Sequence, residues 1–108
     1  MVVIAAVDES VRSTDIVREA AKLADKFGGE LHVVHVISQN EYEDLLQNSA
    51  QQWDSLEPDD VQDIADAVAE DAVSGLDQAY RVVPLVGDEA DEIVKYADEH
   101  DARYIVIG

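Results

Sequence analysis

A short acidic segment follows the first apolar run of the chain and holds the residues best suited to bind a ligand. Asp8, Glu9 and Ser10 come directly after residues 2–7, which read Val-Val-Ile-Ala-Ala-Val. A carboxylate in this place can accept hydrogen bonds from a ribose hydroxyl or an adenine amino group. It can equally accept hydrogen bonds from free backbone N–H groups and cap the turn or helix that follows. Both roles are open for Asp8, and they predict different effects of its removal.

The histidines, cysteines and glycines indicate little further chemistry. His32 and His35 are three residues apart in an apolar run, so on a strand they point to opposite faces and cannot bind one metal ion. We expect His35 to be a hydrogen-bonded core residue and His100 to interact with the carboxyl end of a helix. Cysteine is absent, which excludes disulfides and thiolate zinc sites. The five glycines fit neither of the common phosphate-loop motifs, G-x-G-x-x-G and G-x-x-x-x-G-K-[ST]. No serine or lysine has a base partner in sequence that would indicate hydrolysis.

Alternating strands and helices must position these residues. Continuous apolar runs at residues 2–7 and 31–37 predict strands that are buried on both faces. Between them an apolar stripe at helical spacing ends at Gly28, a residue type that accepts the left-handed conformation closing a helix. Residues 80–84 and 103–108 predict a third and a fourth strand.

Two more helices connect the later strands. A proline followed by two aspartates is typical of a helix start and predicts a helix over residues 58–76. Asp88 and Asp91 resemble a capping arrangement for a helix that runs to His100. The polar residues 38–57 fit a short helix and a packed loop equally well. In the helical alternative one face would carry Tyr42, Leu45, Leu46, Ala50 and Trp53.

The order of these elements predicts one α/β domain with a doubly wound parallel sheet and helices on both faces. A chain of 108 residues has room for a single domain of this kind. Ligands of open α/β sheets bind beyond the carboxyl ends of the strands, where the strand order reverses. We therefore expect the site at those ends. A buried strand as the last element also predicts a domain that is incomplete at its C-terminus.

The charge balance excludes two classes of partner. The chain has 25 acidic and 7 basic residues, a formal net charge of −18. Nucleic acid and anionic membranes require a cationic face, so neither is expected as a partner. The acids recur on every segment, which is typical of a surface adapted to high salt; the alternative is a surface that binds cations or a basic protein. Neither a membrane span nor a signal peptide is found, and we expect a cytoplasmic protein.

Four segments together resemble the universal stress protein family. They are residues 4–10, 31–36, 87–93 and 104–108, and they match in order along the whole chain. The family has a doubly wound, five-stranded parallel sheet with the adenine nucleotide alpha hydrolase-like fold. The resemblance implies the strand order 3-2-1-4 here, with the fifth strand missing. Many members of the family bind ATP, and others do not.

The resemblance also implies a set of site residues at the ends of the first, second and fourth strands. The positions that match the adenosine pocket of ATP-binding members are Ala6, Val7, Asp8, Val36, Ile107 and Gly108. Asp8 would hold the ribose or the adenine, the Val36 backbone would read the adenine edge, and Ile107 would pack on the base. The family's phosphate motif, G-x2-G-x9-G-[S/T], begins at the glycine ending the fourth strand, and only that glycine, Gly108, is present. The later glycines would supply the backbone N–H groups that hold phosphates.

By this resemblance the chain is a stress-response module that binds an adenine nucleotide, ATP, with Mg²⁺ as a candidate companion ion. It would act through ligand-dependent association as a homodimer, with slow ATP hydrolysis at most. The alternative is a dimerisation or interaction module of the same fold that binds no nucleotide. A third candidate is a phosphorelay receiver domain, because Asp8 and Glu9 resemble its acidic pair. That family needs an aspartate at the end of the third strand, where this chain has Pro84 and Leu85.

Overall fold

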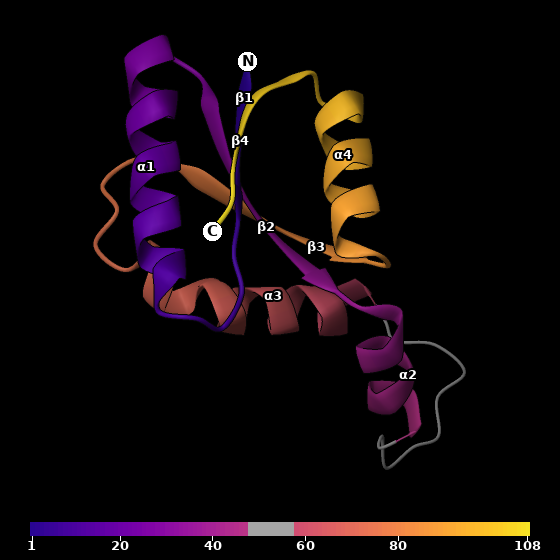
Figure 1. The fold of residues 1–108 in the computed structure, drawn as a ribbon. Helices are drawn as coiled ribbons and strands as arrows, with labels where there is room; N and C mark the ends of the chain where they lie inside the picture. The colour runs from indigo at the N-terminus through magenta and orange to yellow at the C-terminus, as the bar shows by residue number, and fades with distance from the viewer. Residues whose placement is uncertain (48–57) are drawn as a thin grey trace.

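The computed structural model describes residues 1–47 and 58–108, and in this part of the chain four parallel strands form one sheet with helices packed against it (Figure 1). In chain order the elements are β1 (Val2–Ala6), α1 (Arg12–Phe27), β2 (Glu30–Ile37), α2 (Gln39–Gln47), α3 (Pro58–Val73), β3 (Tyr80–Val86), α4 (Glu89–Glu99) and β4 (Ala102–Val106). The strand order is β3-β2-β1-β4, and every pair is parallel. The predicted fold class and the order 3-2-1-4 are confirmed.

β1 lies in the interior of the sheet, and this explains its uninterrupted apolar sequence. Its residues pair with β2 on one side and with β4 on the other; Ile4, for example, pairs with His32 and with Ile105. Val3, Ile4 and Ala5 are fully buried. A strand with neighbours on both edges and helices over both faces has no position where a polar side chain could reach water.

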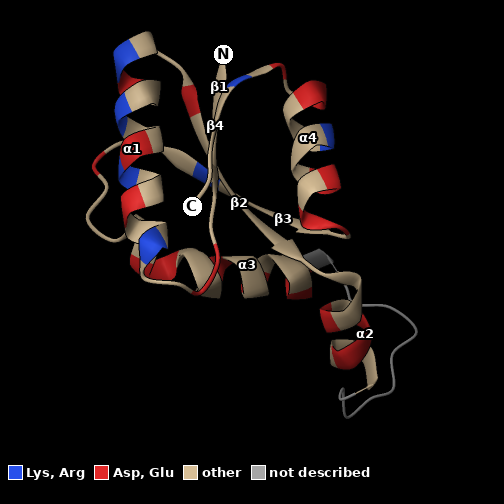
Figure 2. Ribbon diagram, in the orientation of Figure 1, with Lys and Arg blue, Asp and Glu red and all other residues tan. Residues whose placement is uncertain are grey.

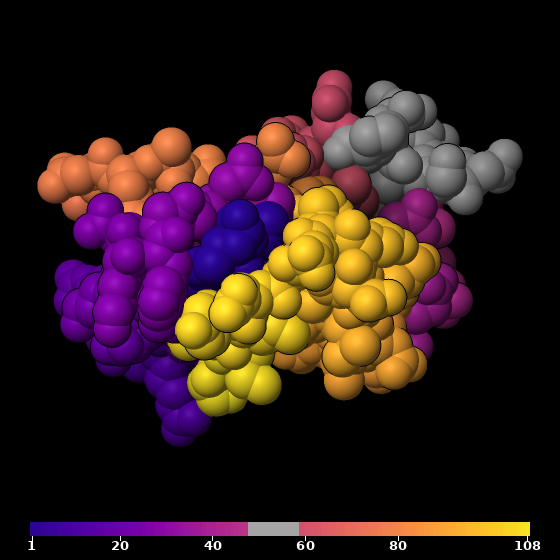
Figure 3. Space-filling view, turned by 90° about the horizontal axis from the view of Figure 1, so that it is seen from above, coloured from indigo at the N-terminus to yellow at the C-terminus, as the bar shows by residue number. Residues whose placement is uncertain are grey.

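Helices cover the two faces of the sheet unequally (Figure 1). α1 and α3 pack on one face, where Val3, Leu31 and Ala69 belong to the larger core cluster. α4 packs on the other face, where Ile4 and Tyr96 belong to the smaller cluster. Viewed from the amino ends of the strands, the start of β1 lies between α1 and the segment that contains β4 (Figure 3). The edge strand β4 is only partly covered.

The ends of α1 and α4 follow the predicted rules. Gly28 closes α1 with a φ of 67°, and its N–H reaches the carbonyl groups of Ala24 and Asp25. The carboxylate of Asp88 accepts a hydrogen bond of 3.1 Å from the N–H of Asp91 and caps α4. Both signals are local, since a left-handed residue and a short polar side chain act within one turn of the backbone.

Several boundaries differ from those predicted. α3 ends at Val73 rather than at residue 76, and β4 ends at Val106 rather than at residue 108. β3 extends to Val86 because its pairing with β2 continues as far as Ile37. The end of a strand therefore depends on how far its neighbour continues. The sequence of the strand itself does not carry this information.

Within the segment that allowed two interpretations, residues 39–47 form the helix α2. The hydroxyl group of Ser38 accepts a hydrogen bond of 3.1 Å from the N–H of Glu41 and so starts the helix. Tyr42 and Leu46 are half-buried, whereas Leu45 is exposed. Ala50 and Trp53, which were expected on the same helical face, lie outside the described residues.

Charge is distributed unevenly over the helices (Figure 2). α3 contains six acidic residues and no basic one in the sequence PDDVQDIADAVAEDAV. α1 contains four of the seven basic residues of the chain, which are Arg12, Arg18, Lys22 and Lys26. The cationic side chains are thus concentrated on the helix that follows Asp8.

Candidate functional site

Asp8 organises the turn between β1 and α1. One of its carboxylate oxygens, Oδ1, accepts a hydrogen bond of 2.8 Å from the N–H of Ser10. The hydroxyl group of Ser13 accepts a bond of 2.9 Å from the Asp8 N–H and lies 2.8 Å from the Asp8 carbonyl oxygen, to which it donates. Ser13 is buried on the inner face of α1. The capping role of Asp8 is therefore present, although it closes the turn and not the helix itself, whose N-cap is Val11.

The Asp8 carboxyl group is stabilised in its charged form. Hydrogen bonds from Ser10 are the main reason why its pKa lies below the ordinary value, with smaller contributions from Ser13 and from the nearby His35. Hydrogen bonds to an ionised carboxylate lower its pKa because they favour the charged state. The hydrogen bonds from the Ser10 N–H and from the Ser13 hydroxyl group both use Oδ1, and the side chain of Ser10 also hydrogen-bonds to the carboxylate.

A hollow of about 290 Å³ opens at the carboxyl ends of β1 and β4. We call it the β1–β4 hollow, and its lining residues are Ala6, Val7, Asp8, Ser10, Arg12, Ile16, Glu89, Ile107 and Gly108. Five of the six residues predicted for the site therefore line one cavity. Ile107 is 64% exposed and presents an apolar side chain at its edge.

Val36, the sixth predicted residue, lies outside this hollow at the end of β2. The pairing of β1 with β2 ends at Ala6 and Val34, two residues earlier. The carbonyl group of Val34 accepts from the N–H of Val7, whereas that of Ile37 accepts from Gly87 beyond β3. The backbone groups of successive residues in a strand point alternately to its two neighbours. Those of Val36, like those of Val34, therefore point to the β1 side, but β1 has already ended at this level.

A second hollow, of about 600 Å³, borders the same turn on the side of α2 and α3. We call it the β1–β2 hollow; its lining residues are Asp8, Glu9, Ser10, His35, Glu41, Asp44, Leu45, Ile64 and Val68. Asp8 and Ser10 line both hollows. The two cavities therefore meet at the Asp8 turn.

His35 faces this second hollow with a defined tautomer. Its Nδ1 lies 3.1 Å from the carbonyl oxygen of Val7, and because a carbonyl oxygen can only accept, Nδ1 carries the hydrogen. In the neutral ring Nε2 then remains an acceptor. His32 lies on the opposite face, where its Nδ1 is 2.6 Å from the hydroxyl oxygen of Tyr96. The two histidines point to opposite faces, as predicted.

Sequence reasoning missed Arg12 and Glu89, which line the β1–β4 hollow, and Ser13, which supports the Asp8 turn from behind. Ser13 could have been found, because it precedes Ile16 and Val17 by three and four residues and so extends the buried stripe of α1 by one turn. Arg12 and Glu89 begin α1 and α4, and no local pattern indicates that these helix starts converge on the end of β4.

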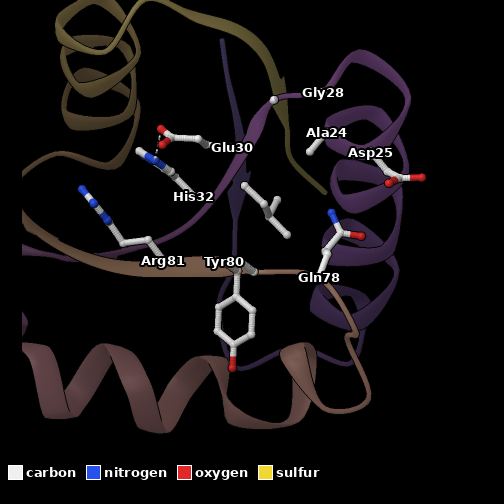
Figure 4. A pocket seen from close by; sticks show the side chains of 11 residues that line it. Ala24, Asp25, Gly28, Glu30, His32, Gln78, Tyr80 and Arg81 are labelled. Atoms are coloured by element: carbon white, nitrogen blue, oxygen red, sulfur yellow. Dashed lines mark ion pairs between the residues drawn. The ribbon is translucent and has the colours of Figure 1, made fainter.

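Polar side chains also gather at the amino ends of β2 and β3, around a pocket of about 420 Å³ (Figure 4). Glu30 Oε2 lies 3.4 Å from His32 Nε2 there, a contact that becomes an ion pair when His32 is protonated, and Arg81 is the register partner of His32 on β3. None of the predicted site residues lines this pocket. It lies at the opposite end of the strands from Asp8.

Two further classes of site are absent from residues 1–47 and 58–108. No group of three or more histidine, aspartate or glutamate side chains is placed to hold a metal ion in this part of the chain. None of its helices is both long and apolar enough to cross a bilayer.

Comparison with solved structures supports the fold. A universal stress protein in complex with cAMP superposes with a TM-score of 0.70 at 21% identity, covering 100% of this chain and 75% of that chain. A protein from Mycobacterium tuberculosis H37Rv gives a TM-score of 0.62 at 23% identity, with coverages of 99% and 69%. A universal stress protein from Archaeoglobus fulgidus gives 0.53 at 25% identity, with coverages of 99% and 74%.

The sequence comparisons place the chain in a family. No curated protein sequence matches it significantly. The model of the universal stress protein family, however, matches residues 1–108, and the resemblance found in four sequence segments agrees with this match. The chain belongs to the universal stress protein family.

Proposed function

We propose that this chain is a cytoplasmic stress-response module that binds an adenine nucleotide at the carboxyl ends of β1, β2 and β4. The observation that carries the proposal is the arrangement of Asp8. Its charged carboxylate is held by Ser10 and Ser13 of its own turn, and the residue lines both hollows. A charged acceptor held in place by its own turn is well suited to a ribose hydroxyl group.

The remaining predicted residues fit a nucleoside that lies across this turn. The Val36 backbone faces the end of β1, where its N–H and carbonyl groups can pair with the edge of an adenine ring. Ile107 offers apolar surface beside the sugar and base. A universal stress protein of the same fold has been solved with cAMP, which supports a nucleotide as the class of ligand.

ATP is the ligand that family membership suggests, and Mg²⁺ would accompany it. The β1–β4 and β1–β2 hollows would hold the adenosine part of ATP. Because the described residues offer no cluster of metal ligands, we propose that Mg²⁺ would be held chiefly by the phosphates of the nucleotide.

Ligand-dependent association, as a homodimer, is the second part of the proposal. Ile105 of the edge strand β4 and Ile107 just beyond it are 40% and 64% exposed, and Val94 of α4 is 63% exposed. Exposed apolar side chains at the edge of a sheet favour association. The same observation also favours the alternative function, an interaction module that associates without nucleotide.

Titration calorimetry and sedimentation of one preparation test both functions. We expect adenosine and ATP to bind, and bound ATP to shift the chain toward a dimer. A chain that dimerises with equal affinity in the presence and absence of ATP, and releases no heat with adenosine, would identify the interaction module instead. Guanosine is the matched ligand control, because its base presents a donor and an acceptor in the reversed order to the Val36 backbone.

A further inference from the structure

Arg12 is the one cationic side chain that lines the β1–β4 hollow. It is the first residue of α1 and lies across the end of β4, because its Cδ is 3.8 Å from the position that a Cβ atom of Gly108 would take. The space that a side chain at Gly108 would take is filled by Ile16, whose Cδ1 lies 2.9 Å from that position. Arg12 lies beside it and so borders both the end of β4 and the Asp8 turn.

Arg12 forms no ion pair within residues 1–47 and 58–108. In this part of the chain Lys22 pairs with Glu19, and Glu30 lies 3.4 Å from His32, a contact that is an ion pair only when His32 is protonated. Glu89 lines the same hollow without forming an ion pair with Arg12. Arg12 is exposed to solvent, so its side chain is accessible to an anionic ligand that enters the hollow.

We propose that Arg12 binds the phosphate group attached to the ribose of the nucleotide. The inference rests on the proposed nucleotide site, where Asp8 holds the ribose at one wall of the hollow. A guanidinium group offers paired N–H donors that match two oxygens of a phosphate. The amino end of α1 adds a partial positive charge at the same place.

The acidic surface makes this residue necessary for an anionic ligand. A phosphate group that approaches a strongly acidic protein is repelled, and only carboxylates within a Debye length of about 8 Å contribute appreciably at physiological salt. In the β1–β4 hollow those carboxylates are Asp8 and Glu89. Arg12 would offset the repulsion from these carboxylates by direct contact with the phosphate group. Arg12 should therefore favour phosphate binding, and Glu89 should oppose it.

The experiment compares adenosine with adenosine monophosphate as probes, by calorimetry at physiological salt. The variants are Arg12→Gln, Arg12→Lys and Glu89→Gln. The matched control is Arg18→Gln, which removes an exposed arginine from the same helix without touching the hollow. Circular dichroism checks that each variant keeps its helices.

We expect wild-type protein to bind the monophosphate more tightly than adenosine. Arg12→Gln should weaken monophosphate binding about 10- to 100-fold, the range for a lost hydrogen bond to a charged group, and leave adenosine unchanged. Arg12→Lys should show a smaller loss because the charge remains without the paired donors. Glu89→Gln should strengthen monophosphate binding alone, and this variant keeps the inference testable even where Arg12→Gln is poorly folded.

Equal losses of monophosphate affinity in Arg12→Gln and Arg18→Gln would overturn the inference, because they would show a general effect of net charge. Equal wild-type affinities for the two probes, unchanged by Arg12→Gln and Glu89→Gln, would overturn it as well while the proposed nucleoside site stands. If wild-type protein binds neither probe, the proposed function fails and this inference fails with it.

Discussion

At the scale of single residues, the Asp8 carboxylate holds its own turn and also lines two hollows. Oδ1 accepts a hydrogen bond from the Ser10 N–H and lies 3.2 Å from the Ser13 hydroxyl oxygen, and Asp8 borders both the β1–β4 and the β1–β2 hollow. The structural and the ligand-binding interpretation of Asp8 are therefore compatible.

Removal of the Asp8 carboxylate should affect both stability and binding. We expect Asp8→Ala to lower the free energy of unfolding by about 1 kcal/mol, as for a lost cap. We also expect it to weaken nucleotide binding about 10- to 100-fold. Urea denaturation and calorimetry on the same sample measure the two effects.

Ser13→Ala is the matched control, because Ser13 belongs to the turn but does not line the β1–β4 hollow. It should lower the urea midpoint and leave nucleotide affinity nearly unchanged. If Asp8→Ala lowers stability and leaves the affinity at the wild-type value, Asp8 is a structural residue only.

At the scale of elements, the contact between α4 and the sheet contains an unusual polar cluster. His32 of β2 is buried, with 3% of its surface exposed, and contacts the hydroxyl group of Tyr96 at 2.6 Å. His100 stacks on the Tyr96 ring with a centroid distance of 3.9 Å. Glu30 and Arg81 approach from β2 and β3. The attachment of α4 is therefore sensitive to the protonation of His32.

Burial is the main reason why the pKa of His32 is lowered, with smaller opposing contributions from Glu30. The unfolded chain, where histidine titrates near a pH of about 6.5, takes up this proton before the folded chain does. Stability should therefore fall as the pH decreases below that value, and the fall should end below the folded-state pKa. Denaturation midpoints between about pH 7.5 and 5.5 measure this slope.

His32→Gln should remove this part of the pH dependence, while carboxylate titration, which is common to both proteins, cancels in the comparison. His35→Gln is the control, because it removes a histidine from the opposite face of the sheet. A slope that is the same in wild type and His32→Gln would contradict the prediction.

At the scale of the whole molecule, self-repulsion dominates the electrostatics. The net charge is −18, and α3 has acidic residues without a basic residue to pair with them. Adaptation of this surface to high salt remains a prediction. Like charges separated by one helical turn, such as Asp66 and Glu70, destabilise a helix by a few tenths of a kcal/mol per pair.

Added salt should stabilise this protein by screening the repulsion. The Debye length falls from about 30 Å at 0.01 M to about 3 Å at 1 M, so we expect the thermal midpoint to rise by several degrees between dilute buffer and molar KCl. Circular dichroism measures this midpoint. Glu70→Gln should raise the midpoint in dilute buffer and reduce the effect of salt. A midpoint that KCl leaves unchanged would remove the argument for a salt-adapted surface.

Local sequence patterns alone determined the order of the elements, the parallel sheet and the ends of two helices. The apolar run of residues 2–7 indicated a doubly covered strand, and Gly28 and Asp88 marked helix ends, because periodicity and backbone sterics act over a few residues. Five of the six predicted site residues line one hollow, since the carboxyl ends of parallel strands share one edge of the sheet; their role in binding stays a prediction.

Only the tertiary structure decided which side chains from separate elements meet. Arg12 and Glu89 begin different helices, yet both line the hollow at the end of β4. His32 and Tyr96 are 64 residues apart and share a hydrogen bond. Such contacts depend on the strand order and on which face each helix covers. They arise from the packing of all elements together, so no window of the sequence contains them.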